Sequence, residues 1–188
     1  MKKFLEKLEK EADKKYVTYI LAAVAFFESI VFPIPVDILT FGLAAVHPKK
    51  WIKFGTVSTV WSVLGAVFGY ILGAYLFDSF GQQMIDFYGY QEQFNQVIKL
   101  FNKNTFLVIF TAAFTPIPFK VFTIAGGALR VAFLPFVIAS ILGRGLRFFL
   151  GVYLAKKFGK KITSHIMKKI NIYSIALVVI VSLYIIIF

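Results

Sequence analysis

Residues 33–40 read PIPVDILT, and residues 116–123 read PIPFKVFT. The two octapeptides lie 83 positions apart, and the first holds an acid, Asp37, where the second holds a base, Lys120. Each copy carries two prolines, which are Pro33 and Pro35 in the first and Pro116 and Pro118 in the second. Proline has no backbone N–H and breaks the hydrogen-bond ladder of an α-helix, so carbonyl groups near each copy need other partners. Both copies are therefore predicted to be turns within apolar, helical segments.

A second pair of similar segments follows the octapeptides in the same order. LGAVFGYILGAYLFDSFG at 64–81 aligns with LGRGLRFFLGVYLAKKFG at 142–159. Chance similarity between apolar stretches is the alternative, but the shared residues include glycines here and prolines in the octapeptides, which apolar composition does not require. Two matching blocks predict an internal repeat of roughly 80 residues.

The composition is that of a membrane protein. Of the 188 residues, 59% are hydrophobic and the mean hydropathy is +0.79, whereas soluble domains are about 45–50% apolar. Continuous apolar stretches cover 54–77, 131–155 and 171–188, each close to the roughly 20 residues that cross a bilayer as a helix. The sequence predicts an all-α polytopic membrane protein.

The distribution of charge argues against a nucleic-acid partner. The formal net charge is +12, and most of the 21 basic residues fall in three clusters that flank apolar segments, at 2–15, 49–53 and 156–169. The positive-inside rule places such clusters at the cytoplasmic ends of membrane helices, which explains the charge without nucleic acid. The chain has no cysteine, so disulfide bonds and thiolate metal sites are excluded.

The basic clusters also decide how the interrupted segments lie. If residues 16–46 crossed the bilayer, the cluster at 49–53 would face the side opposite the other two clusters. If they enter and return, all three clusters share the cytoplasmic side. Length favours the second arrangement, because 31 residues in one helix would span about 46 Å, against a hydrocarbon core of about 30 Å. We therefore predict a re-entrant pair of half-helices.

One re-entrant pair and one crossing per repeat make the number of crossings odd, so the second repeat is expected to be inverted relative to the first. The two octapeptides then meet near the midplane, where Asp37 and Lys120 are placed to face one another. The predicted organisation is a cytoplasmic amphipathic helix at 1–15, a first repeat at 16–81, a periplasmic interfacial segment at 82–105, a second repeat at 106–159, a basic cytoplasmic segment at 160–170 and a transmembrane helix at 171–188, which puts the C-terminus outside.

Three segments carry a resemblance to a known family. FFESIVFPIPVD at 26–37, FTPIPFKVFTIAGG at 114–127 and LGRGLRFFLG at 142–151 resemble the DedA family, whose shared core is also called the VTT or SNARE-associated domain. The resemblance covers about residues 16–159. It implies a multi-pass protein of the bacterial inner membrane with two opposed re-entrant loops and a role in moving lipids. Bacterial members are linked to undecaprenyl phosphate recycling and to envelope maintenance that depends on the proton-motive force, and eukaryotic relatives to phospholipid scrambling.

The resemblance also points to residues. The membrane acids of the family correspond to Glu28 and Asp37. Many members carry an arginine in the second loop, where this sequence has Lys120, and its arginines stand at 130, 144 and 147. This departure leaves the lipid substrate open.

Five ionisable residues fall inside apolar segments and are the candidate substrate and proton site: Glu28, Asp37, Lys120, Arg144 and Arg147. At about 2.5–3.5 kcal/mol each near a helix centre, they must be paired or hydrated. Arg144 and Arg147 are three apart, so they project from nearly one helix face and are placed to bind one anion together. Three bases against two acids leave one positive charge, which a phosphate headgroup would balance. Purely structural ion pairing is the alternative.

Two further roles follow from charge. Burial disfavours the ionised form of a carboxyl group and nearby cations favour it, so Glu28 and Asp37 are expected to exchange protons and to couple headgroup release to proton flow. Arg130 ends the second interrupted segment and is either an outer capture point for the substrate or an interfacial anchor.

Glycines mark close helix contacts. Gly65, Gly69 and Gly73 repeat every four residues, and Gly151 is the counterpart of Gly73 in the second repeat. This spacing favours close helix approach. Packing within one chain is the favoured use, and formation of a homo-oligomer is the other.

The favoured function is a transporter or flippase that moves a phosphate-bearing lipid, with polyprenyl phosphate ahead of ordinary phospholipid. A passive phospholipid scramblase and a non-transporting assembly factor are the alternatives. An enzyme is not expected, because His47 and His165 lie in basic loops and no metalloprotease or membrane-serine pattern is present. No cofactor or metal is expected.

Overall fold

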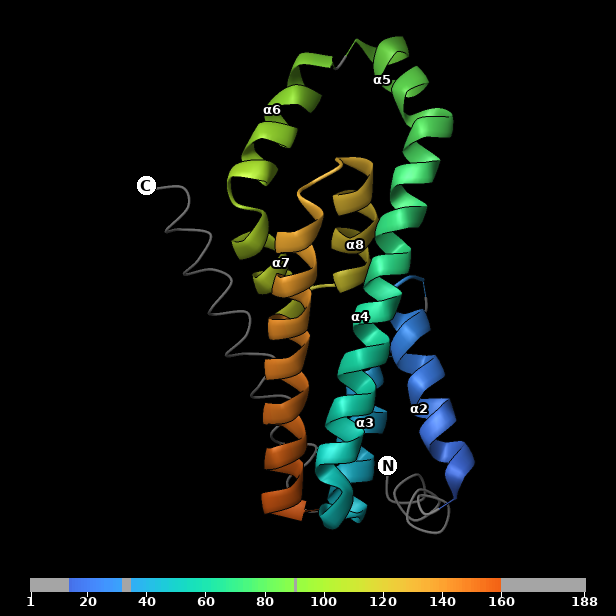
Figure 1. Ribbon diagram of the computed structural model, residues 1–188, viewed down its shortest axis with the longest axis vertical. Helices are drawn as coiled ribbons and strands as arrows, with labels where there is room; N and C mark the ends of the chain where they lie inside the picture. The colour runs from blue at the N-terminus through green and yellow to red at the C-terminus, as the bar shows by residue number, and fades with distance from the viewer. Residues whose placement is uncertain (1–13, 32–34, 90, 160–188) are drawn as a thin grey trace.

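The computed structural model describes residues 14–31, 35–89 and 91–159, and these contain helices and no strand (Figure 1). In chain order the elements are α2 (Lys15–Glu28), α3 (Val36–Val46), the 3-10 turn η1 (Pro48–Lys50), α4 (Trp51–Leu76), the π-helical turn η2 (Phe77–Gly81), α5 (Gln82–Tyr88), α6 (Gln91–Lys103), α7 (Thr105–Phe114), α8 (Phe119–Ala128) and the helix Phe133–Gly159. The predicted all-α class is confirmed. Nearly all of the predicted helix at 1–15, and the predicted segments 160–170 and 171–188, lie outside the described residues.

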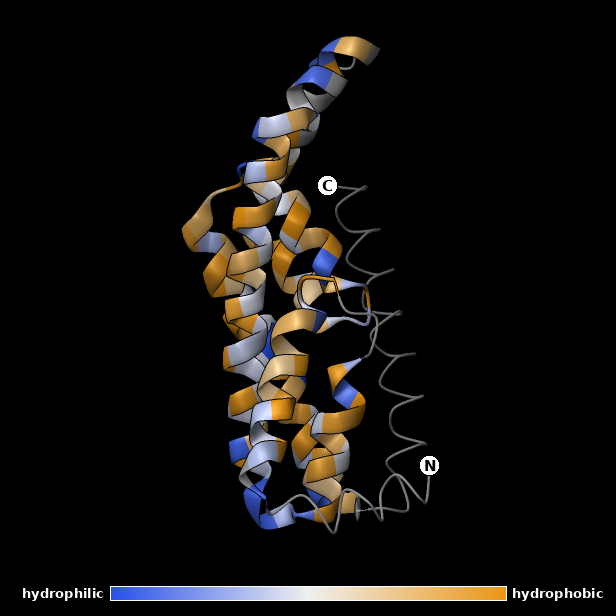
Figure 2. Ribbon diagram, turned by 90° about the vertical axis from the view of Figure 1, so that its right-hand side faces the viewer, coloured by the Kyte–Doolittle hydropathy of each residue, from blue (hydrophilic) through white to orange (hydrophobic). Residues whose placement is uncertain are grey.

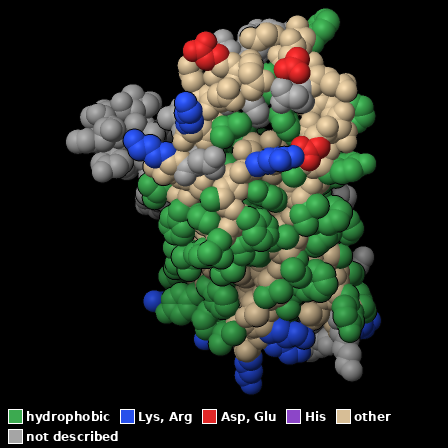
Figure 3. All heavy atoms as spheres, turned by 45° about the horizontal axis from the view of Figure 1, so that its top comes forward, with side chains coloured by type: hydrophobic (Ala, Val, Ile, Leu, Met, Phe, Trp, Pro, Cys, Tyr) green, Lys and Arg blue, Asp and Glu red, His purple; other side chains and the backbone are tan. Residues whose placement is uncertain are grey.

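Within the described residues, two helices are long and apolar enough to cross a membrane. Pro48–Gly81, which includes α4, has 34 residues, and Phe133–Gly159 has 27. At about 1.5 Å per residue, both exceed the roughly 30 Å of a hydrocarbon core. Large apolar side chains such as Phe68, Ile71 and Leu146 stand exposed on them. Figure 3 shows hydrophobic side chains gathered in a broad band between a basic end and an end that carries both acidic and basic side chains. A surface of this kind is typical of a protein that lies in lipid.

The shorter apolar helices form two pairs that lie toward opposite ends of the two long helices. Figure 1 shows α2 and α3 toward the end where α4 begins, α8 beside the other half of α4, and α7 beside the helix Phe133–Gly159. Both predicted helix breaks are confirmed, because α2 ends at Glu28 and α3 begins at Val36, while α7 ends at Phe114 and α8 begins at Phe119. The turns of the two pairs therefore approach each other near the middle of the molecule.

The lysines of two basic clusters lie at one end of the molecule. The ammonium of Lys156 lies 4.8 Å from the centre of the Trp51 ring, which brings the end of the helix Phe133–Gly159 to the start of α4. Lys49 and Lys50 occupy the turn just before Trp51. The beginning of α2 lies at this end as well (Figure 1). The clustering of basic charge that the sequence predicted for one side is therefore present in the described part of the chain.

Glycines on α4 allow α8 to touch it backbone to backbone. A Cβ added at Gly73 would lie 2.0 Å from the carbonyl oxygen of Ile124, and one added at Gly127 would lie 1.8 Å from that of Tyr70. A Cβ at Gly69 would lie 2.6 Å from the hydroxyl oxygen of Thr123. The glycine spacing of α4 thus serves helix packing within the chain.

Equivalent glycines of the two repeats make equivalent contacts with the first helix of each pair. A Cβ at Gly65 would lie 2.2 Å from the carbonyl oxygen of Phe26 on α2. Its counterpart, Gly143, faces α7, where a Cβ would lie 2.9 Å from the carbonyl oxygen of Phe110. Each long helix therefore packs tightly against the helix that opens its own repeat.

A second set of equivalent glycines connects the two halves. Gly73 packs on Ile124 of α8, and its counterpart Gly151 packs on Phe41 of α3, whose ring would lie 2.0 Å from an added Cβ. Ile124 and Phe41 are themselves 83 positions apart, the offset of the octapeptides. Each long helix thus contacts the second short helix of the other half.

Two hydrophobic clusters lie on either side of the molecule's middle. The first includes Leu21, Phe41 and Phe148 and joins α2 and α3 to the long helices. The second includes Ile109 and Phe136 and joins α7 and α8 to them. The charged residues of the candidate site lie where these clusters meet.

The segment 82–105, predicted to be interfacial, is helical. It forms α5 and α6, an arch that extends beyond the apolar body (Figures 1 and 2). Figure 2 shows hydrophilic and hydrophobic residues alternating along this arch, in contrast to the predominantly hydrophobic helices below it. Phe101, on the last turns of α6, packs against the second hydrophobic cluster.

The close approach of α4 and α8 gives a first prediction. Gly73→Ala places a methyl group against backbone that has no room to move, and overpacking of this kind costs about 1–3 kcal/mol. We expect a lower midpoint of thermal unfolding in detergent. Gly145→Ala is the matched control, because the nearest atom to its added Cβ, Thr59 Cγ2, lies 3.7 Å away and alanine favours the helix. Equal midpoints for the two variants would contradict the packing described here.

Candidate functional site

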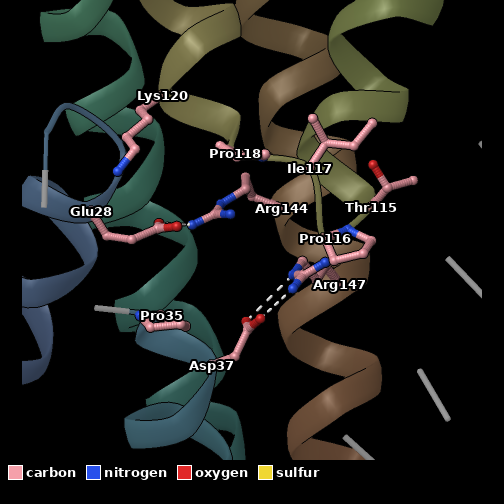
Figure 4. Close-up of a pocket in the computed structure, with 10 residues that line it drawn as sticks. All are labelled: Glu28, Pro35, Asp37, Thr115, Pro116, Ile117, Pro118, Lys120, Arg144 and Arg147. Atoms are coloured by element: carbon pink, nitrogen blue, oxygen red, sulfur yellow. Dashed lines mark hydrogen bonds and ion pairs between the residues drawn. The ribbon is translucent and has the colours of Figure 1, made fainter. Parts of the chain in front are cut away.

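The two turns meet at a pocket with a volume of about 220 Å³. Figure 4 shows the residues that line it, and they come from both helix pairs and from the helix Phe133–Gly159. The lining residues are Glu28, Pro35, Asp37, Thr115, Pro116, Ile117, Pro118, Lys120, Arg144 and Arg147. All five ionisable residues that the sequence placed in apolar segments are among them. Pro33 lies outside the described residues.

Helix ends position the acids and the lysine. Glu28 is the last residue of α2, Asp37 lies in the first turn of α3 and Lys120 in the first turn of α8. The positive end of the helix dipole favours the carboxylate of Asp37 and disfavours the ammonium of Lys120. Arg144 and Arg147 project from the middle of a continuous helix, which holds their backbone rigidly.

Each arginine is paired with one carboxylate. Arg144 donates from Nη2 to Glu28 Oε2, and Arg147 donates from Nη2 to Asp37 Oδ2 and from Nε to Asp37 Oδ1 at 3.4 Å. The side chains of the first pair are 4% and 19% exposed, and those of the second pair 10% and 16%. Charge pairing therefore offsets the cost of placing four charges in an apolar body.

The observed pairing differs from the one expected from the repeat. Asp37 was expected to face Lys120, whereas its ion-pair partner is Arg147. Arg144 and Arg147 were expected to share one anion, whereas each holds its own carboxylate. Arg147 contacts both Asp37 and the carbonyl of Phe114, whereas Lys120 contacts the carbonyl of Val31, just after α2.

Lys120 and Arg147 satisfy carbonyl groups that the prolines leave without a helical donor. In an α-helix, the carbonyl of residue i accepts from the N–H of residue i+4. For Val31 and Phe114 that residue is a proline. Lys120 Nζ donates to the carbonyl of Val31 at 3.2 Å, and Arg147 Nη1 to that of Phe114 at 3.1 Å. Val31 and Phe114 hold equivalent positions in the two copies, and both are satisfied by cations of the second repeat.

A third carbonyl of the same kind is satisfied by a hydroxyl group. The residue four positions after Ser29 is a proline, and Thr123 donates from Oγ1 to the carbonyl of Ser29 at 3.0 Å. Thr123 is the last residue of the second octapeptide, so α8 holds the first turn at two points. Among the described residues, every buried side-chain nitrogen and oxygen has a hydrogen-bond partner.

Sequence reasoning missed a set of buried hydroxyl groups around Arg144. Arg144 Nε donates to Ser62 Oγ at 2.6 Å, and Ser62 Oγ lies 2.7 Å from Ser29 Oγ. One turn earlier in α4, Ser58 Oγ lies 2.8 Å from Thr40 Oγ1. The signal that could have found them is the position of both α4 serines on the helix face that continues into its glycines.

Arg130 lies outside the pocket lining. It lies two residues beyond the end of α8, whereas Lys120 lies in the first turn of that helix. Its φ of 49° places it in the left-handed region that glycine favours, and its guanidinium pairs with Asp78 of the π-helical turn. Both side chains of this pair are exposed, at 67% and 52%. Of the six charged residues predicted for the site, Arg130 alone is not brought into the pocket.

The pocket suits an anion with several oxygens. Its two carboxylates and three cations give it one excess positive charge, and guanidinium groups bind phosphate oxygens with good geometry. Among the described residues, no group of three or more histidine, cysteine, aspartate or glutamate side chains is placed to hold a metal ion.

The ion pair between Glu28 and Arg144 gives a second prediction. Arg144→Gln leaves the carboxylate of Glu28 unpaired in an apolar setting, at a cost of about 3–5 kcal/mol. We expect most of this variant to aggregate in size-exclusion chromatography. The neutral double variant Glu28→Gln/Arg144→Gln should recover a monodisperse peak. Equal yields of the single and double variants would show that the pair does not stabilise the fold.

Comparisons with known proteins identify the family of the chain. Residues 16–157 match the family model of the VTT domain. A protein of Haemophilus influenzae, described as uncharacterized, is 34% identical over 165 residues, which cover 88% of this chain and 85% of the relative. A protein of Histophilus somni, described as an uncharacterized protein HI0703 homolog, is 34% identical over 169 residues, which cover 90% and 88%. No solved structure matches the chain significantly. The resemblance drawn from the sequence is confirmed, and the chain belongs to the VTT domain family, the DedA family of membrane proteins.

Proposed function

We propose that this protein is a transporter of the bacterial inner membrane that moves a phosphate-bearing lipid across the bilayer, with polyprenyl phosphate as the favoured substrate. The observation that carries the proposal is the sheltered pocket between the two turns, with its excess positive charge and two arginines. Membership of the family supports a transporter-like role. The choice of polyprenyl phosphate rests on the family resemblance.

The proposed architecture is an inverted repeat with two re-entrant helix pairs. It is supported by α2 and α8 lying beside opposite halves of α4 (Figure 1) and by the equivalent contacts of Gly73 with Ile124 and of Gly151 with Phe41. The helices of the pairs are also short. The 14 residues of α2 span about 21 Å, less than a hydrocarbon core of about 30 Å. Entry from one face and return to it fits this length.

The proposed orientation places the basic end in the cytoplasm. Lys49, Lys50, Lys53 and Lys156 mark this end, and the arch of α5 and α6 then lies on the periplasmic side. The N-terminus is cytoplasmic in this arrangement. With one more crossing at 171–188, the C-terminus is periplasmic.

The pocket is sized for a headgroup and not for a whole lipid. At about 220 Å³, it is smaller than the roughly 300–1,000 Å³ of sites that enclose drug-sized molecules. A lipid phosphate can therefore occupy the pocket while its tail lies along the apolar exterior. Because the lipid tail stays outside the pocket, the pocket selects lipids by their phosphate group and not by their tail.

The two acids offer a route to proton coupling. The acids come from the first repeat and the bases from the second, so substrate binding competes with contacts between the halves. A phosphate that takes Arg147 leaves Asp37 without its partner, and a proton is the simplest replacement. In the proposed cycle, Asp37 takes a proton when the headgroup binds and loses it when the ion pair forms again.

Reconstituted liposomes test the proposal. The assay follows labelled polyprenyl phosphate and labelled phospholipid across the bilayer, with and without an imposed pH gradient. We expect Asp37→Asn/Arg147→Gln, a neutral replacement of the whole pair, to slow transport at least about tenfold, because a hydrogen bond to a charged group contributes about 1.5–3 kcal/mol. Arg130→Gln is the control, and its rate should stay near that of the unaltered protein.

Each alternative function has its own outcome in this assay. A passive scramblase moves both lipids at rates that ignore the pH gradient. A non-transporting assembly factor leaves lipids where they are, and its cellular function survives neutral replacement of the pair. Either result would contradict proton-coupled transport by this pocket.

A further inference from the structure

The two arginines of the pocket are held very differently. Arg144 contacts Glu28 and Ser62, and its guanidinium carbon lies 5.2 Å from the centre of the Phe119 ring and 4.7 Å from that of Phe148. Its side chain is 4% exposed. Arg147 is held by the carboxylate of Asp37 and the carbonyl of Phe114, and its side chain is 10% exposed.

The hydrogen bonds beyond Arg144 run in one direction. A guanidinium only donates, so Ser62 Oγ accepts from Arg144 Nε and keeps its own proton for another acceptor. Ser29 Oγ donates to the carbonyl of Ala25 at 3.2 Å. Ser29 has only one hydroxyl proton, and therefore Ser62 is the donor in the contact between Ser62 and Ser29. The chain begins at Arg144 and ends on the backbone of α2.

This chain of hydrogen bonds is completely buried. Ser29 and Ser62 are 0% exposed and Arg144 is 3% exposed, so no water competes for these groups. Chains of hydrogen bonds strengthen one another in such surroundings, and a broken chain leaves a buried donor without an acceptor. Moving Arg144 toward an incoming phosphate would break the bond to Ser62 and disturb Ser29 as well.

We propose that Ser62 and Ser29 are positioning residues that reserve Arg144 for Glu28 and leave Arg147 as the arginine that exchanges its carboxylate for the substrate phosphate. This inference rests on the proposed function for the role of Arg147, and on the geometry alone for the fixing of Arg144. The two serines hold one arginine as a fixed element of the site. The other arginine is then the one that changes partner.

The protein offers a direct spectroscopic test because the only arginines in its sequence are Arg130, Arg144 and Arg147. A sample labelled with ¹⁵N-arginine gives three Nε–H signals, which Arg130→Lys and Arg147→Lys assign. In the full-length protein in nanodiscs without substrate, we expect the Nε–H of Arg144 to exchange with solvent far more slowly than that of Arg130.

Substitutions of the two serines then test whether the hydrogen-bond chain holds Arg144. Ser62→Ala should speed the exchange of the Arg144 Nε–H about tenfold or more, because its charge-assisted bond is lost. Ser29→Ala should speed it too, although Ser29 does not touch Arg144, and the double variant should be no worse than Ser62→Ala. Ser62→Thr keeps a hydroxyl and should restore slow exchange. Ser140→Ala is the control, since Ser140 is the repeat counterpart of Ser62, is equally buried and donates to its own helix at Phe136.

Unchanged exchange in Ser62→Ala, or additive effects of the two serine substitutions, would overturn the proposed chain. A titration with a soluble phosphate-bearing lipid analogue separates the two parts of the inference. A shifted Arg147 signal with an unmoved Arg144 signal supports the assignment of roles, and the reverse overturns it. Slow exchange at Arg144 with no response of either signal would refute lipid phosphate binding and leave the positioning chain standing.

Discussion

The fold depends on two largely buried ion pairs between the first helix pair and the helix Phe133–Gly159. Each joins residues more than 100 positions apart, since Glu28 and Arg144 are separated by 116 residues and Asp37 and Arg147 by 110. Charges of this kind cost about 2.5–3.5 kcal/mol each in the middle of a membrane helix when they stand alone. Neither half can therefore bury its charged residues without the other. The ion pairs that join the two halves of the fold also bring together the residues of the pocket.

The prolines have two consequences that belong together. They end the short helices, which brings the chain back toward the end from which it came. They also remove N–H donors, so the carbonyls of Ser29, Val31 and Phe114 become acceptors in the middle of the molecule. Backbone of this kind is tolerated at membrane depth only where protein or water satisfies it. The side chains that satisfy it come from the second repeat, so the turns gain both shelter and a polar lining.

The sequence carried enough information to predict the helix breaks, the membrane class and the residues of the pocket. Repeated prolines and five charges in apolar surroundings have few explanations, and the structure brings all five charges together. The partners within the pocket could not be predicted, because the pairing of Asp37 with Arg147 and not with Lys120 depends on how the helices pack. The roles of Ser29 and Ser62 were not predicted either. The position of Ser62 on the glycine face of α4 indicates a buried hydroxyl group, but the sequence does not show whether that group bonds to its own backbone or to a neighbour. Arg130 was left open as a capture point or an anchor, and the length of α8 keeps it out of the pocket.

In the proposed topology, each helix pair enters and leaves the bilayer on the same side, the two pairs from opposite sides. The absence of cysteine makes the chain suitable for labelling of single introduced cysteines with a membrane-impermeant maleimide. Tyr16→Cys and His47→Cys lie at the two outer ends of the α2 and α3 pair, and Asn104→Cys and Arg130→Cys at those of the α7 and α8 pair. We expect positions 16 and 47 to react from the cytoplasmic face alone and positions 104 and 130 from the periplasmic face alone. Reaction of positions 16 and 47 from opposite faces would contradict it.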